Sequence, residues 1–241
     1  MTTRRILATS GGFLPTDRWD VSRPGAIMSE GLRLTGKTRP RVTLVMTASG
    51  DDRTYLLRTY SAFSGWSVDV THLELFSQPN REPRDVILGS DLVWVGGGSV
   101  ANLLAVWRAH GLDSLMTEAW DAGIVLAGVS AGSLCWHVGG TTDSFGPALQ
   151  PVTDGLALLP FGNGVHYDSE AQRRPLLHSL VADTTLPRSY ATDDGIGILY
   201  EGIEPVAVVS DTAVRDDGPA AYLVESVAGE VVETRLAVGT L

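Results

Sequence analysis

One stretch in the middle of the chain restricts how the residues around it can fold. Residues 123–136 read Gly-Ile-Val-Leu-Ala-Gly-Val-Ser-Ala-Gly-Ser-Leu-Cys-Trp. The first part, residues 124–127, is a short apolar run with the β-branched content of a buried strand, and residues 131–136 are able to continue as a helix. Between them the pattern Gly-x-Ser-x-Gly is centred on Ser130, which is the spacing of a nucleophile elbow.

The spacing around Ser130 has a physical reason. A strand that turns abruptly into a helix leaves its central residue with strained backbone angles, and small residues two positions away on either side let the two elements pack closely. The N-terminus of the following helix directs backbone N–H groups at an anion that forms beside the serine. Ser130 is therefore predicted to be a nucleophile. The alternative is an ordinary strand, glycine turn and helix with a serine at the tip.

Strands and helices alternate through the first half of the chain. This order predicts a parallel sheet covered by helices on both faces. The expected strands are residues 5–9, 41–47, 67–75, 91–95 and 124–127, and the expected helices are residues 26–34, 53–64, 112–122 and a segment around Leu103. Ligands bind at the carboxyl ends of the strands in such sheets. The three glycines at 96–98 follow one strand and Ser130 follows the next, so they lie at that end of the sheet. This position supports the prediction that Ser130 is a nucleophile.

The character of the sequence changes after residue 140. Residues 170–181 have helical spacing, and four later segments are predicted to be short strands: residues 195–200, 205–210, 220–227 and 230–237. We expect these strands to be antiparallel additions to the edge of the sheet. Since no linker or internal repeat interrupts the chain, residues 1–241 are predicted to form a single α/β domain, with a mostly parallel sheet, helices on both faces and antiparallel strands at the C-terminal end.

Composition excludes several classes of protein. The formal net charge is −10 and Lys37 is the only lysine, which argues against a basic surface for nucleic acid. Cys135 is the only cysteine, so an internal disulfide and a cysteine-rich metal site are excluded, and we expect neither a metal nor a cofactor. No apolar run approaches the roughly 20 residues that span a bilayer, and no signal peptide is apparent, so a cytoplasmic protein without a membrane partner is expected.

A serine nucleophile needs a base, and five histidines compete for that role. His137 is only seven residues beyond Ser130 and is expected two turns along the same helix, pointing away from the serine. His166 lies on a loop after a strand end, and it is the preferred base. The other three are assigned elsewhere: His110 to a helix end, His178 to the middle of a helix and His72 to a strand.

The acid that orients the base stays open between two aspartates. Asp143 in Thr-Thr-Asp-Ser and Asp194 in Ala-Thr-Asp-Asp-Gly both lie in loops at predicted strand ends. We lean toward Asp194, because the glycine that follows it permits a tight turn toward His166. For the oxyanion, the N–H groups of Gly98 and Ala131 are the natural pair, since glycine lets the backbone approach closely and Ala131 begins the helix. A dinucleotide site at these glycines is disfavoured because the G-x-G-x-x-G spacing is absent.

Four motifs, in this order, resemble the peptidase E family. They are Val-Gly-Gly-Gly-Ser-Val-Ala-Asn-Leu-Leu from residue 95, Gly-Val-Ser-Ala-Gly-Ser from 128, Thr-Thr-Asp ending at 143 and Val-His-Tyr-Asp ending at 168. The resemblance implies a serine peptidase with a fold like that of the class I glutamine amidotransferase domains. It also implies these roles: nucleophile for Ser130, base for His166, oxyanion hole for Gly98 with Ala131, and acid for either Asp143 or Asp194.

Two positions depart from the pattern of the family. The glycine triplet is followed by Ser-Val, where the family commonly has Asn-Thr, and the second acid site reads Asp-Asp-Gly, where the family often has Pro-Glu-Gly.

Members that cleave after an N-terminal aspartate need a cation for that side chain. Arg173 and Arg174 are the nearest candidates for this substrate-binding role, because a guanidinium can bind a carboxylate with two hydrogen bonds.

The preferred interpretation is a serine peptidase that cleaves short peptides through an acyl-enzyme on Ser130, dipeptides with an N-terminal aspartate among them. Its partner is then a small peptide substrate, and a homodimer is left open. The alternatives on the same fold are a cyanophycinase-like or amidotransferase-like hydrolase and a non-catalytic domain that binds a small molecule. Glutaminases of this fold carry cysteine at the elbow, which argues against them here, and Cys135 lies five residues too far along the helix.

Overall fold

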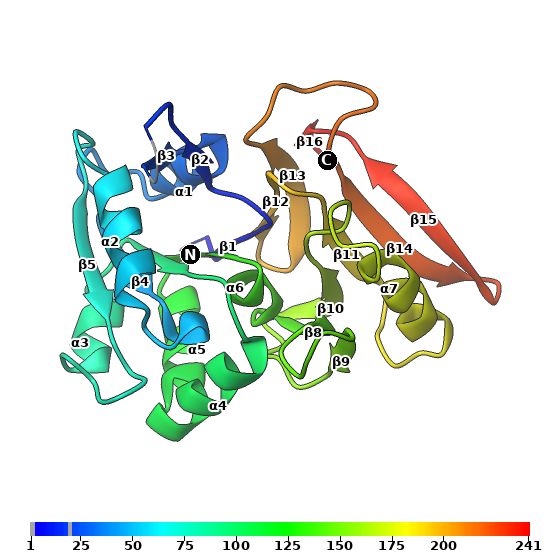
Figure 1. Cartoon of the computed structure of the whole chain (residues 1–241), viewed down its shortest axis with the longest axis horizontal. Coiled ribbons are helices and arrows are strands. Elements are labelled where there is room, and N and C mark those ends of the chain that lie inside the picture. Colours follow the sequence, from blue (N-terminus) through cyan, green and yellow to red (C-terminus); the bar gives the residue numbers. More distant parts are fainter. Residues whose placement is uncertain (1–2, 19–20) are drawn as a thin grey trace.

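The computed structural model describes residues 3–18 and 21–241, and an eight-stranded sheet forms its centre (Figure 1). The carboxyl ends of two hydrogen-bonded parallel strands bring the glycines at 96–98 and Ser130 to the same edge of this sheet, as the sequence predicts. Five neighbouring strands run parallel, in the order β1 (Arg5–Thr9), β7 (Val125–Val129), β6 (Leu92–Val95), β4 (Arg41–Val45) and β5 (Asp69–Leu73).

Antiparallel strands extend the sheet on the other side of β1. β12 (Ile196–Glu201) pairs with β1, β13 (Glu204–Ser210) pairs with β12, and β16 (Gly239–Thr240) forms the edge. Thr9, at the end of β1, therefore lies opposite a residue of parallel β7 on one side and of antiparallel β12 on the other. The prediction that residues 195–200 and 205–210 add antiparallel strands to this sheet is confirmed.

The prediction that all later strands join this sheet is wrong. β14 (Ala221–Val227) and β15 (Glu230–Leu236) pair with each other in a second, six-stranded sheet. β14 pairs with β11 and not with β13, because alternation along a strand fixes which residues face the core but does not fix the neighbouring strand. The other strands of the second sheet are β11 (Ser189–Thr192), β10 (Leu159–Gly164), β8 (His137–Thr142) and β9 (Gln150–Val152).

Helices cover both faces of the parallel strands, as expected. The face that carries Leu7 and Trp94 packs against α1 (Ala26–Leu34) and α2 (Arg53–Ala62). The opposite face, which carries Ile6 and Val93, packs against α3 (Pro83–Leu88), α4 (Val100–His110) and α5 (Leu112–Asp121). Consecutive residues of β1 thus point to opposite layers, which is the period-2 pattern of a strand buried on both faces.

The remaining elements are two helices, a 3-10 turn and a hairpin. α7 (Arg173–Ala182) packs against the second sheet through Leu177, whereas α6 (Ala131–Leu134) is one turn long. The prediction that His137 lies two turns along the helix after Ser130 is wrong, because that helix stops at Leu134 and His137 begins β8. A 3-10 turn, η1 (Thr47–Ser49), follows β4, and β2 (Phe13–Pro15) with β3 (Ser22–Pro24) forms a small hairpin. Within the described residues no helix has the length and apolar character to cross a bilayer.

Candidate active site

Ser130 occupies the turn between β7 and α6. Its backbone lies at φ 58° and ψ −114°, a positive-φ conformation that is unfavourable for a residue with a side chain. Close packing requires the two neighbouring glycines. A Cβ on Gly128 would lie 2.3 Å from the carbonyl oxygen of Gly132, and a Cβ on Gly132 would lie 2.3 Å from the carbonyl oxygen of Val95. The strand and the helix therefore approach each other as closely as the sequence pattern predicts.

Two backbone segments enclose Ser130. Its N–H donates to the carbonyl oxygen of Thr9, at the end of β1, over 3.0 Å. On the other side, Gly97 approaches so closely that a Cβ there would lie 3.2 Å from the Cβ of Ser130. Gly98 has a φ of +136°, and a Cβ on it would lie 2.3 Å from the carbonyl oxygen of Ala48. Glycine at 97 and 98 is thus what allows this loop to reach the serine.

The two predicted oxyanion donors follow from the same geometry. Ala131 is the first residue of α6, so its N–H is one of the helix's first N–H groups, which have no acceptor within the helix. The N–H of Gly98 belongs to the peptide group that follows Gly97, the glycine in contact with Ser130. Ala131 thus adjoins Ser130 along the chain, and Gly98 follows the glycine whose backbone contacts Ser130.

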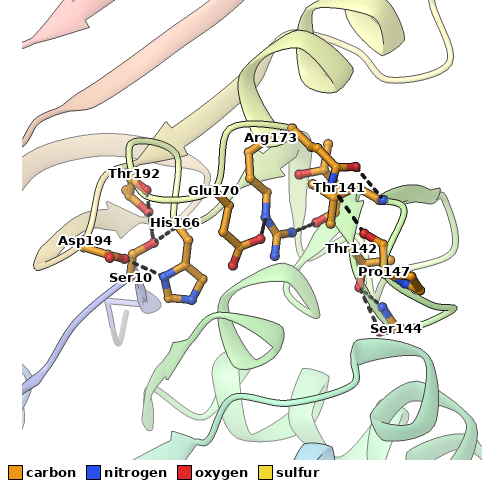
Figure 2. A network of polar contacts seen from close by, with 12 residues as sticks. Ser10, Thr141, Thr142, Ser144, Pro147, His166, Glu170, Arg173, Thr192 and Asp194 are labelled. Atoms are coloured by element: carbon orange, nitrogen blue, oxygen red, sulfur yellow. Dashed lines mark hydrogen bonds and ion pairs between the residues drawn. The ribbon is translucent and has the colours of Figure 1, made fainter.

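His166 lies just beyond β10 and contacts Asp194. Its Nδ1 is 2.5 Å from Asp194 Oδ1, as Figure 2 shows, and its backbone has a φ of 52°. With the aspartate ionised, Nδ1 carries the proton and donates, which leaves Nε2 as the basic nitrogen. The Asp194 N–H in turn donates to Asp168 Oδ1 over 2.9 Å. The side chains of His166 and Asp194 are both partly exposed, so a substrate can reach this pair.

Two consecutive residues at the end of β1 connect this pair to Ser130. Thr9 accepts the N–H of Ser130, and the Oγ of Ser10 accepts the N–H of His166 over 3.1 Å. The Ser10 hydroxyl also lies 2.7 Å from the Oγ1 of Thr192 (Figure 2). No hydrogen bond joins the side chains of Ser130 and His166, both of which are among the described residues. Such bonds are often long before substrate binds.

Asp143, the other predicted acid, lies elsewhere. It follows β8, its side chain is exposed, and it lines a cavity of about 490 Å³ together with Glu170 and Gln172. The adjacent Ser144 Oγ accepts the N–H of Ala101 over 3.4 Å, which holds this loop against the first turn of α4. In the described structure the carboxylate in contact with His166 is therefore that of Asp194.

The two predicted substrate-binding arginines differ in burial and in the residues that they contact. The side chain of Arg173 is only 2% exposed; its Nε donates to Glu170 Oε2 over 2.7 Å, and its Nη1 donates to the carbonyl oxygen of Thr141 (Figure 2). Arg174 pairs with Glu233 of β15, and its guanidinium lies over the rings of Tyr167 and Tyr222. Arg173 therefore lies between His166 and the loop of Asp143, whereas Arg174 is directed at the C-terminal hairpin.

Sequence reasoning missed a group of residues that hold His166 in place. Glu233 Oε2 accepts hydrogen bonds from the hydroxyl of Tyr167 and from Nε2 of His178, each over 2.8 Å. Tyr167 is the residue after His166, and burial, the largest cause, together with the Glu233 carboxylate raises the pKa of its hydroxyl. No motif marks Glu233, because a lone glutamate in an alternating strand has the pattern of a solvated position.

Two further aspartates hold the turn that carries Asp194. The Oδ2 of Asp193 accepts from the N–H of Ala220 over 2.9 Å and from the hydroxyl of Tyr222 over 3.2 Å, and burial raises the pKa of this carboxyl. Asp211 donates its N–H to the carbonyl oxygen of Gly195 over 2.8 Å. The carboxylate of Asp211 also accepts the N–H groups of Gly12 and Ile27, so it joins this turn to the loop after β1 and to the start of α1.

Neither His137 nor Cys135 is available for the chemistry. Burial lowers the pKa of His137 to about 4, and its Nδ1 lies 2.9 Å from the carbonyl oxygen of Ser133. Burial also raises the pKa of the Cys135 thiol, which donates to the carbonyl oxygen of Gly132. Among residues 3–18 and 21–241 no three histidine, cysteine, aspartate or glutamate side chains are grouped as metal ligands.

Comparison with known proteins gives a consistent result. The model of Peptidase family S51 matches residues 9–206. The chain is 34% identical to an uncharacterized peptidase, YgaJ, of Bacillus subtilis over 235 residues, which is 98% of each protein. It is also 27% identical over 157 residues to Peptidase E of Shewanella denitrificans, covering 61% of this chain and 65% of that protein.

The fold has a solved counterpart. The crystal structure of a peptidase from an acI-B1 actinobacterium superposes with a TM-score of 0.69, covering 99% of this chain and 96% of that one. At 15% identity the similarity concerns the fold alone. The expected class I glutamine amidotransferase-like α/β fold is confirmed, with the second sheet as the feature that the sequence analysis did not predict.

Proposed function

Because the chain belongs to peptidase family S51 and is a serine-type peptidase, we propose that it hydrolyses short peptides, dipeptides included, through an acyl-enzyme on Ser130. One observation carries this proposal. The His166–Asp194 pair and the strained turn of Ser130 are both hydrogen-bonded to the end of β1, through Ser10 and Thr9. A base, its orienting acid and a serine at a half-buried turn are the parts that acyl transfer needs.

The chemistry follows from the positions of these groups. His166 Nε2 takes the hydroxyl proton while Ser130 Oγ attacks the peptide carbonyl, and Asp194 stabilises the imidazolium that forms. The C–N bond then breaks, the imidazolium gives its proton to the leaving amine, and an ester on Ser130 remains. Water, deprotonated by the same imidazole, attacks this ester. The bond from the acyl carbon to Ser130 Oγ then breaks, the imidazolium returns its proton to Oγ, and the acid is released.

The oxyanion of each tetrahedral intermediate needs two N–H donors. We assign this role to Gly98 and Ala131. The close approach of Gly97 to Ser130 supports the role of the next peptide N–H, and the position of Ala131 at the start of α6 supports the second donor. Gly128-Val-Ser130-Ala-Gly132 then acts as a nucleophile elbow, in which the strain at Ser130 holds its hydroxyl clear of the sheet.

Labelling with a fluorophosphonate, followed by a panel of dipeptides, tests this function. Wild-type protein is expected to be labelled at Ser130 and to hydrolyse at least part of the panel. A cyanophycinase-like or amidotransferase-like hydrolase would be labelled but would leave the dipeptides intact. A non-catalytic binding domain would do neither, because its serine is not activated. Either of the last two results would contradict the proposal.

Specificity for an N-terminal aspartate has its own test. Arg173 lies beside Glu170, at the border of the cavity that Asp143 lines, whereas Arg174 is occupied by Glu233. If the substrate carboxylate displaces Glu170, Arg173→Met should raise KM for Asp-Xaa dipeptides about 10-fold or more relative to Ala-Xaa, since a hydrogen bond to a charged group contributes about 1.5–3 kcal/mol. Arg174→Met is the matched control, and it should leave that ratio unchanged. Equal wild-type rates on Asp-Xaa and Ala-Xaa would contradict a role for any cation.

A further inference from the structure

A cavity of about 280 Å³ lies beside the turn of Ser130 on the side of α2. Gly11 and Val129 line it from the ends of β1 and β7, Phe13 lines it from the β2–β3 hairpin, and Tyr55, Thr59 and Ala62 line it from α2. Its volume is at the small end of the range for ligand sites, which suits one side chain better than a longer segment of peptide.

Three walls of this cavity are joined to the proposed catalytic groups. Val129 immediately precedes Ser130. Gly11 immediately follows Ser10, whose Oγ accepts the N–H of His166. The Tyr55 hydroxyl accepts a long hydrogen bond, 3.5 Å, from the N–H of Gly97, the glycine in contact with Ser130. A group in this cavity is therefore bound next to the bond that Ser130 would cleave.

The walls are rigid and mostly carbon. The ring of Phe13 packs edge-to-face on Phe63 and Trp94, with centroids 5.6 and 5.5 Å apart. Thr59 also lines the cavity, and its hydroxyl already donates to the carbonyl oxygen of Tyr55 within α2 over 2.9 Å. Arg58 is the only charged residue in the described lining. Such walls favour an apolar side chain, because removing its surface from water is favourable.

We propose that this cavity binds an apolar side chain of the peptide substrate, on the residue that follows the scissile bond. The inference rests on the proposed function. It assigns the two substrate residues to opposite sides of Ser130, because α7, which carries Arg173, and α2 lie on opposite sides of the turn (Figure 1). The residue before the scissile bond then faces Arg173 and the loop of Asp143, and the residue after it faces α2.

The test compares the same substitution, threonine to leucine, at two positions of α2. Thr59→Leu fills the cavity, whereas Thr54→Leu makes the same change at an exposed position of α2. Wild-type kcat/KM is expected to be higher for Ala-Leu and Ala-Phe than for Ala-Ala. Thr59→Leu should lower kcat/KM for Ala-Leu and Ala-Phe by about 10- to 100-fold, the range that one group in an apolar pocket gives, and change it less than about threefold for Ala-Ala. Thr54→Leu should leave all three values unchanged.

Other outcomes separate this inference from the function on which it rests. A wild-type protein that cleaves no dipeptide rejects the proposed function. Cleavage without a preference for leucine or phenylalanine, or an equal loss on all three substrates in Thr59→Leu, rejects the cavity alone. So does a preference for an acidic second residue that disappears in Arg58→Met. If Thr59→Leu does not fold, Ala62→Val, which narrows the same cavity by less, should show the same selective loss to a smaller degree.

Discussion

Ser130→Ala is expected to abolish peptide hydrolysis, with kcat reduced by about 10⁴- to 10⁶-fold, the usual loss for the nucleophile of a triad. The substitution removes one oxygen at the tip of a turn. The backbone bonds that hold the turn, from Ser130 N–H to Thr9 and from the N–H of Leu134 to the Ser130 carbonyl, do not involve the side chain. Steady-state turnover and the circular dichroism spectrum, measured together, distinguish loss of chemistry from loss of fold.

Cys135→Ser serves as the control for this prediction. The thiol is buried five residues beyond Ser130 and donates to the carbonyl oxygen of Gly132, a bond that a hydroxyl can also make. Activity should be nearly unchanged. A Ser130→Ala protein that keeps more than a tenth of wild-type turnover would show that the mechanism is wrong, and so would a thiol reagent that abolishes activity without disturbing the packing.

Asp194→Asn is expected to lower kcat by about 10⁴-fold with little change in KM. The carboxylate of Asp194 contacts His166 Nδ1 over 2.5 Å, and this contact keeps the proton on Nδ1. An amide can present its NH₂ to the ring instead, which favours the other tautomer and leaves Nε2 unable to take the proton of Ser130.

Asp143→Asn is the matched substitution, with the same change of charge on the loop after β8, where the carboxylate does not contact His166. Asp143 lines the cavity beside Glu170, so its replacement should act mainly on KM. A large loss of kcat in Asp143→Asn, with a small one in Asp194→Asn, would reverse the assignment of the orienting acid. Similar losses in both variants would mean that neither carboxylate alone orients the base.

Local pattern predicted much of the parallel half of the fold. The helix expected at residues 26–34 is α1 with the same bounds, and the strand expected at 91–95 is β6 from Leu92 to Val95. The glycines at 96–98 and Ser130 lie close together because they follow β6 and β7, which are parallel neighbours and end at the same edge of the sheet. This follows from the topology alone. The second sheet could not be predicted, because residues 220–237 have the alternation of strands but nothing in that alternation selects β11 as their neighbour.

The proposed catalytic residues were easier to find than the residues that hold them. Ser130 and His166 have residue types that chemistry requires, and their loops have recognisable glycines. Asp193 and Asp194 are adjacent and of the same residue type, and only the glycine after Asp194 favoured it in the sequence. In the structure Asp193 is buried against Ala220 while Asp194 contacts His166. Asp194 begins the turn that follows Asp193, so one side chain of the pair faces the site and the other faces the core. Which one does so depends on β14.

The hairpin of β14 and β15 is translated after the site residues whose neighbours it holds. Ser130, His166 and Asp194 are all translated before residues 220–236, but the contacts that hold Tyr167 and Asp193 come from Tyr222, Ala220 and Glu233. Chains emerge from the ribosome N-terminus first. A nascent chain therefore carries every proposed catalytic side chain before the hairpin that holds the neighbouring Tyr167 and Asp193 has been made.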